Sequence, residues 1–163
     1  MDYMIRQGLK LGKPVTFGVD CLIDPYCWLI SIGNKVAIGS RVQIITHDAS
    51  TKLFLGYDKI GKVVIGNNVF IGQGSIILPN VKIGNRVIVG AGSVVTEDIP
   101  SDSVAFGNPA KVKSTIDEFL EKNRNLMKQR PKYNSSFSLN GNPSQEKKAQ
   151  MLNDLQNGVA FIE

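Results

Sequence analysis

The sequence predicts a parallel β-solenoid followed by a short helical appendage. Three observations lead to this prediction: an aliphatic residue followed by glycine recurs every six residues, a second small or aliphatic position recurs in the same frame, and the period becomes helical near residue 115. A six-residue period fits neither an α-helix of 3.6 residues per turn nor a flat strand of period two. The expected fold class is therefore an all-β solenoid with a helical tail.

Large aliphatic residues mark the first position of the repeat. They stand at every sixth position in two stretches, Ile32, Ile38 and Ile44, and then Ile65, Ile71, Ile77, Ile83, Val89 and Val95. If each unit is one short strand and one turn, three units close a triangular coil of about 18 residues, and stacked coils place like residues above one another. Glycine after the aliphatic residue would tolerate corner angles that a residue with a Cβ resists. A β-sandwich is the weaker alternative, because its strands keep no fixed period.

The same frame assigns the first coil. Ile23 and Leu29 take the large inward position, and Cys21 and Cys27 take the smaller one. Both cysteines are therefore expected in the core, where free cysteine behaves as a small hydrophobic residue, and not in a disulfide, a zinc site or catalysis. The frame slips by three residues between Leu29 and Ile32, which predicts a shortened or reset corner.

A long interruption of the repeat spans residues 45–62. It begins with Thr46-His47-Asp48 and contains the only histidine of the chain. A rigid solenoid fixes the base of such a loop and leaves the loop free of packing demands, so function is expected there. Imidazole can take a proton from a hydroxyl group near neutral pH, which makes His47 the candidate general base. Asp48 is expected to be solvated.

Further segments complete a resemblance to a known family. They are Val89-Gly90-Ala91-Gly92-Ser93-Val94-Val95-Thr96-Glu97-Asp98-Ile99-Pro100 and Ala105-Phe106-Gly107-Asn108-Pro109-Ala110-Lys111-Val112. With the hexapeptide frame and the histidine-bearing loop, they resemble the hexapeptide-repeat acyltransferases over roughly residues 12–114. Residues 23–30 and 46–52, with the tail after 114, are most similar to sugar O-acetyltransferases of capsular and exopolysaccharide synthesis. The resemblance implies a left-handed parallel β-helix, which the period alone does not give.

The resemblance also implies a homotrimer that uses acetyl-coenzyme A and no metal. His47 matches the family's general base, which implies direct transfer to a hydroxyl of a sugar or saccharide without a covalent enzyme intermediate. Donor contacts are implied at Gly72, Gln73, Gly90, Ala91 and Thr96, with Lys111 and Lys113 as cations for the coenzyme phosphates. Glu97 departs from the lysine that is common in the family beside Thr96.

Acceptor contacts are expected from Asp24, Tyr26, Trp28 and Tyr57. The aromatic rings can stack on a pyranose face, and Asp24 can hold a hydroxyl group or orient His47. Other acceptors remain open, namely an amino sugar, an antibiotic or serine, and so does a non-catalytic scaffold. A zinc hydratase of the γ carbonic anhydrase kind is disfavoured, because its metal needs several histidines.

Composition limits the partners and the compartment. The net charge of +5 over 163 residues is not concentrated in a basic arm, so a nucleic-acid partner is not expected. No apolar run reaches the length of a membrane span, and the first residues do not form a signal sequence, so the expected compartment is the cytoplasm.

Residues 115–163 are expected to form the appendage of a solenoid domain over residues 1–114. Thr115 and Glu118 have the spacing of a capping box, which predicts a helix that ends before Pro131 and closes the open end of the solenoid. Residues 131–143 are rich in Asn, Ser, Gly and Pro and predict an irregular linker. A second helix is expected over about residues 144–157.

Overall fold

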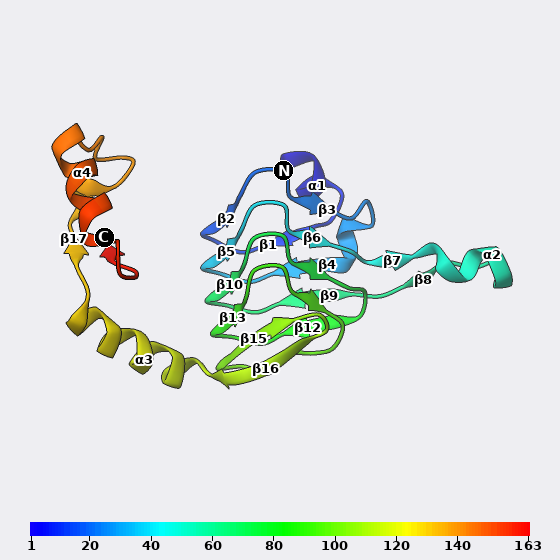
Figure 1. Cartoon of the computed structure of the whole chain (residues 1–163). Helices are drawn as coiled ribbons and strands as arrows, with labels where there is room; N and C mark the ends of the chain where they lie inside the picture. The colour runs from blue at the N-terminus through cyan, green and yellow to red at the C-terminus, as the bar shows by residue number, and fades with distance from the viewer. The chain divides into compact units, whose positions relative to one another are not determined.

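The computed structural model describes all 163 residues, which form two compact units, Met1–Asp117 and Glu118–Glu163. The first unit is a parallel β-helix whose coils build three sheets (Figure 1). Sheet 1 contains β1 (Lys10–Leu11), β4 (Ile30–Ile32), β9 (Val63–Ile65) and β12 (Val81–Ile83). Sheet 2 contains β2 (Val15–Phe17), β5 (Val36–Ile38), β10 (Val69–Ile71), β13 (Val87–Val89), β15 (Ser103–Gly107) and β16 (Ala110–Thr115). Sheet 3 contains β3 (Leu22–Ile23), β6 (Gln43–Ile44), β11 (Ile76–Ile77) and β14 (Val94–Val95).

Like residues stack on like residues, as the period predicts. Ile71 pairs with Val89, and Ile77 pairs with Val95, each one coil apart. These four side chains are buried, and so are the serines that take the smaller inward position. The hydroxyl of Ser75 donates a hydrogen bond to a main-chain carbonyl. The interior is therefore a narrow aliphatic column in which the hydroxyl groups of Ser75 and Ser93 are paired.

The repeat glycines serve close stacking of the coils, and the expected corner angles are wrong. None of the six repeat glycines has a positive φ; that conformation belongs instead to residues such as Asn68, Asn80 and Arg86. A Cβ on Gly66 would lie 2.6 Å from the carbonyl oxygen of Gly84 in the next coil. Glycine is needed because two backbones approach too closely for a side chain.

The first coil departs from the predicted frame. Residues Cys27–Leu29 form a 3₁₀ turn, η1, and the inward positions after it are Ile30 and Ile32. Leu29 is only half-buried, so its assignment to the large inward position is wrong, and the corner is longer by three residues rather than shortened. Cys27 is buried and Cys21 is partly buried against the core, and both are free thiols.

An arm leaves the solenoid between β6 and β9 (Figure 1). It consists of β7 (His47–Asp48), the 3₁₀ turn η2 (Ala49–Thr51), helix α2 (Lys52–Leu55) and β8 (Lys59–Ile60). Strands β7 and β8 pair antiparallel, so the two ends of the arm return to the same corner of the coil. This pairing fixes the backbone of His47 at the base of the arm.

Each end of the first unit has its own closing element. Helix α1 (Asp2–Arg6) precedes the first coil, and Met4 packs against the core. At the other end, β16 turns back antiparallel to β15 and covers the outer edge of sheet 2. Strand β16 thus pairs with an edge that the sequence analysis expected the following helix to close.

The second unit is small. Helix α3 (Ile116–Gln129) leads into it, and its other elements are β17 (Lys132–Tyr133), the 3₁₀ turn η3 (Ser135–Phe137), α4 (Gln145–Asp154) and β18 (Phe161–Ile162). The predicted irregular linker is partly wrong, because β17 pairs parallel with β18. The buried Tyr133 donates from its hydroxyl to Asp154 at 2.9 Å. None of the helices has the length and apolar character needed to cross a membrane.

Candidate active site

Asp24 and His47 meet where the arm leaves the coils. Asp24 follows β3 and His47 follows β6, so both lie at the edge between sheets 3 and 1, one coil apart. The distance between His47 Nδ1 and Asp24 Oδ2 is 2.6 Å. A carboxylate accepts hydrogen bonds, so Nδ1 carries the proton and Nε2 keeps a free lone pair. The imidazole is 35% exposed, which leaves it open to a substrate.

Asp24 is held in place by the main chain. Its side chain is 1% exposed, and it accepts hydrogen bonds from the backbone N–H groups of Thr46 and Tyr26, each at 2.9 Å. Burial by itself raises the pKa of Asp24. The Thr46 and Tyr26 N–H groups and the His47 ring outweigh it, and the pKa lies below the ordinary value of an aspartate. Asp24 is therefore ionised at neutral pH and fixes the tautomer of His47.

A groove of about 440 Å³ opens beside the imidazole. Its walls are Ile45, His47, Asp48, Ala49, Lys59, Leu78, Pro79 and Thr96. The sequence analysis missed Leu78, Pro79 and Lys59. The period could have found the first two, since they follow Ile77, which stacks on Ile44 just before the arm. We call this cavity the His47 groove.

Asp48 does not orient the histidine. It pairs with Lys59 at 2.9 Å across the β7–β8 ribbon and accepts the backbone N–H of Ser50 at 2.9 Å. The hydroxyl and N–H groups of Ser50, together with Lys59, hold the pKa of Asp48 below its ordinary value. Its role is to fix the start of η2, as an N-cap residue does.

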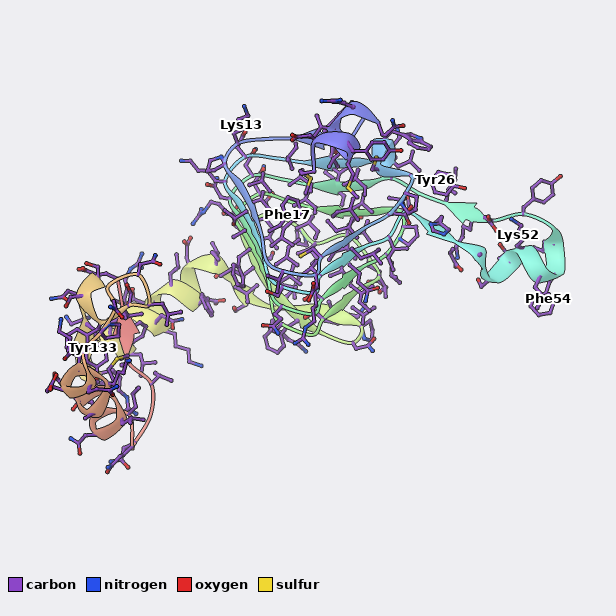
Figure 2. The ribbon with its side chains drawn as sticks, turned by 90° about the horizontal axis from the view of Figure 1, so that it is seen from above. Lys13, Phe17, Tyr26, Lys52, Phe54 and Tyr133 are labelled. Carbon is purple, nitrogen blue, oxygen red and sulfur yellow. The ribbon has the colours of Figure 1, made fainter.

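One of the three aromatic acceptor candidates, Tyr26, lies beside the histidine; Trp28 contacts Tyr26, and neither ring lines the His47 groove. The ring centroid of Tyr26 is 5.3 Å from that of His47 and 5.3 Å from that of Trp28, with edge-to-face geometry in both pairs. Tyr26 is seen at the base of the arm in Figure 2, with Lys52 and Phe54 farther out. Tyr57 follows α2 on the arm with 81% exposure and is not among the groove residues.

Most donor candidates lie at another edge of the same chain. Gly72 and Gln73 follow β10, and Gly90 and Ala91 follow β13, so all four are at the edge between sheets 2 and 3. A Cβ on Gly72 would lie 2.3 Å from the nitrogen of Ala91, and one on Gly90 would lie 2.7 Å from the Cβ of Phe106. Coil packing alone accounts for these two glycines. Within one chain, the edge between sheets 2 and 3 is therefore a different corner of the coil from the one that carries His47.

The remaining donor candidates divide between the groove and the last hairpin. Thr96 lines the His47 groove. Lys111 lies on β16 and forms an ion pair of 2.9 Å with Glu97, beside Thr96 in the sequence. The Lys113 ammonium lies 5.7 Å from the centroid of the Phe106 ring. Glu97, the acidic residue that departs from the family pattern, therefore forms an ion pair with one of the two predicted phosphate-binding lysines.

Comparison with known proteins identifies the family. Residues 62–97 match the family described as "Bacterial transferase hexapeptide (six repeats)". Protein CapG of Staphylococcus aureus is 45% identical, and the match covers 74% of each chain. The chain belongs to the hexapeptide-repeat transferases. The β-helix is accordingly the left-handed one of this family, which confirms the predicted fold class.

Solved structures of hexapeptide-repeat transferases are similar to the chain over the solenoid. A maltose O-acetyltransferase from Clostridium difficile 630 is 32% identical with a TM-score of 0.58, over 70% of this chain and 73% of that one. A serine acetyltransferase in complex with CoA is 25% identical with a TM-score of 0.53, over 65% of this chain and 40% of that one. The chain is therefore an acyltransferase of the acetyltransferase class.

Proposed function

We propose that this chain transfers the acetyl group of acetyl-coenzyme A to a hydroxyl group of a sugar or saccharide, with His47 as the general base. The observation that carries the proposal is the 2.6 Å contact between His47 Nδ1 and the buried carboxylate of Asp24. In the neutral imidazole this contact holds the proton on Nδ1 and leaves the Nε2 lone pair available to accept a proton from a substrate. An imidazole oriented by a buried aspartate is the usual way to activate a hydroxyl nucleophile.

The acetyl group then passes directly from the thioester to the acceptor through a tetrahedral oxyanion, without a covalent bond to the enzyme. Nε2 of His47 takes the proton of the acceptor hydroxyl as its oxygen bonds to the thioester carbonyl carbon. The oxyanion that forms is stabilised by a main-chain N–H group, and the C–S bond breaks as the carbonyl is restored. The departing thiolate receives the proton from His47, so the products are an acetyl ester and free coenzyme A. Asp24 stabilises the imidazolium that exists between these two proton transfers.

The donor proposal requires neighbouring copies of the chain. Gly72, Gln73, Gly90 and Ala91 lie at a different edge from His47, so a groove between two copies would join them. Outward side chains on both sides of that edge are apolar, with Phe70 on sheet 2 and Ile76 and Val94 on sheet 3. Stable oligomers typically bury outward apolar faces of this kind at the interfaces between their subunits. A homotrimer, as in the family, would bring the donor candidates of one copy to His47 of the next and would cover these apolar side chains.

Charged groups around Thr96 fit the polar end of the donor. The Lys111 ammonium is half-exposed and can exchange Glu97 for a coenzyme phosphate, since exposed ion pairs contribute little stability. Lys113 supplies a second cation on the same strand. Because acetyl-coenzyme A is an intracellular metabolite, we place the reaction in the cytoplasm.

A second acceptor class is an amino acid, because serine acetyltransferases share the fold. The Tyr26 ring beside His47, with Trp28 next to it, favours a sugar, since aromatic rings pack against the apolar face of a pyranose. An amino sugar would place an amine at the same base, and an amine demands less of it, whereas an antibiotic such as chloramphenicol would offer a hydroxyl group.

An acceptor panel tests the proposed function. The full-length protein is given acetyl-coenzyme A with methyl glucoside, maltose, methyl galactoside, lactose, glucosamine, chloramphenicol or serine, and released thiol is measured with a chromogenic disulfide. We expect at least a tenfold higher kcat/KM for a sugar hydroxyl than for serine, and mass spectrometry should show an ester. Highest activity with serine, with chloramphenicol or at the amine of glucosamine would contradict the proposal, and thiol release without acceptor is the blank.

A further inference from the structure

The three-residue insertion in the first coil presents an aromatic side chain to solvent, one ring removed from His47. In-frame positions are six residues apart along most of the solenoid, whereas Ile23 and Ile32 are nine apart. The added residues form η1, and Trp28 is its middle residue. The insertion lies at the corner that carries Asp24, so it changes the surface next to the base.

Three contacts hold the backbone of η1 in place. Cys27 is 2% exposed, and the Tyr26 N–H group donates to the buried Asp24 carboxylate. Gly8, at a φ of +106°, lies against Trp28, where a Cβ would come within 2.9 Å of the Trp28 Cβ. The backbone of the turn is thus fixed, while the Trp28 side chain is 52% exposed.

The rings of Trp28, Tyr26 and His47 form a row that ends at the proposed general base, His47. Tyr26 meets Trp28 at an interplanar angle of 86° and His47 at 73°, both edge to face. The indole and the imidazole each contact Tyr26 and not each other. An exposed, well-held indole offers a large rigid apolar surface at little entropic cost on binding, which is why tryptophan is frequent at recognition sites.

We propose that Trp28 binds the sugar next to the one that is acetylated, so that the acceptor is a saccharide of at least two linked sugars. The inference rests on the proposed function. Since Tyr26 separates the indole from the imidazole, a ring stacked on Trp28 leaves its linked neighbour to present a hydroxyl to Nε2. The binding surface around Trp28 is open, which suits a chain that extends beyond the reacting unit. A single sugar or serine would leave Trp28 unused.

Kinetics with matched acceptors test the proposal. Methyl glucoside is compared with maltose, and methyl galactoside with lactose, using whichever pair the acceptor panel shows to be acetylated. We expect the disaccharide KM to be at least tenfold lower in the wild type, and Trp28→Ala to raise it about tenfold with kcat unchanged, because the contact is the same in the ground and transition states. Trp28→Phe should restore most of the affinity.

The control is Tyr3→Ala, which removes a more exposed aromatic side chain, 73% against 52% for Trp28, from α1 without touching the row of rings. It should leave both acceptors unaffected. Equal KM values for methyl glycoside and disaccharide in the wild type would overturn the proposal, and so would an equal effect of Trp28→Ala on both. Absence of transfer to any sugar is a different result, because it contradicts the proposed function itself.

Fluorescence gives a readout independent of turnover. Trp28 is the only tryptophan of the chain, so its emission reports directly on this surface. We expect maltose or lactose to shift or quench the emission saturably at the concentrations that saturate turnover, and the matching methyl glycoside to leave it unchanged. Unchanged emission with a saturating disaccharide would rule out contact with the indole.

Discussion

Replacing His47 with alanine is expected to lower kcat for acetyl transfer by two to four orders of magnitude, the range that a general base contributes. The acceptor hydroxyl then loses its proton only to water, while the donor contacts at the other edge are untouched. The KM for acetyl-coenzyme A should therefore change little. Thiol release by wild type and variant, with the best acceptor of the panel, measures both constants.

The control for this variant is Lys52→Ala on the same arm. Lys52 pairs with Asp58 through an exposed ion pair and does not line the His47 groove. Its loss should leave kcat within about twofold of the wild type, because exposed pairs of this kind stabilise proteins by little. Full turnover in the His47→Ala protein would remove the imidazole from the reaction.

Replacing Asp24 with asparagine is expected to lower kcat by roughly two to four orders of magnitude, because a general-base histidine held in the wrong tautomer cannot accept the proton. Asparagine has nearly the same shape and can still accept the N–H groups of Thr46 and Tyr26. It carries no charge to stabilise the imidazolium, and its amide can turn to force the other tautomer on His47. The loss should appear in kcat and leave the KM of the donor unchanged. A variant with normal kcat would show that Asp24 serves packing alone.

The same variant gives a pH-dependence of stability. The pKa of Asp24 is depressed in the folded protein, so ionised Asp24 contributes stability above the unfolded-state pKa of a carboxyl group, and the contribution is lost as the pH falls through the folded-state value. The difference in unfolding free energy between wild type and Asp24→Asn should be full at pH 7 and should shrink below the ordinary carboxyl range. Urea unfolding at several pH values measures it, and a difference that stays constant in acid would be inconsistent with an ionised Asp24.

The register of the solenoid was predictable because the repeat leaves little freedom. A six-residue period in a three-sided coil fixes which residues stack, and the pairs Ile71 with Val89 and Ile77 with Val95 follow from counting. The interruption of the period likewise located the arm and placed His47 at its base. The regular repeat therefore made both the stacking register and the position of the arm predictable from the sequence.

The contacts across coils were harder to predict. Asp24 was expected either to hold an acceptor hydroxyl group or to orient His47, and the period could not choose between these roles, because the two residues are 23 positions apart rather than the 18 of a regular coil. The reason for the repeat glycines was missed because a close approach between two coils has no signature within one coil. The β17–β18 pair joins residues nearly thirty positions apart in a segment without a repeat, so no local sequence pattern predicts this pairing.

A crystal structure of the protein with coenzyme A tests the central claim most directly. The account predicts that the thiol sulfur lies beside Nε2 of His47, with the pantetheine arm along Gly72 and Ala91 of a neighbouring copy in a trimer. Coenzyme bound away from the His47 groove, or an imidazole turned from the thiol with Asp24 still in contact with its Nδ1, would contradict it.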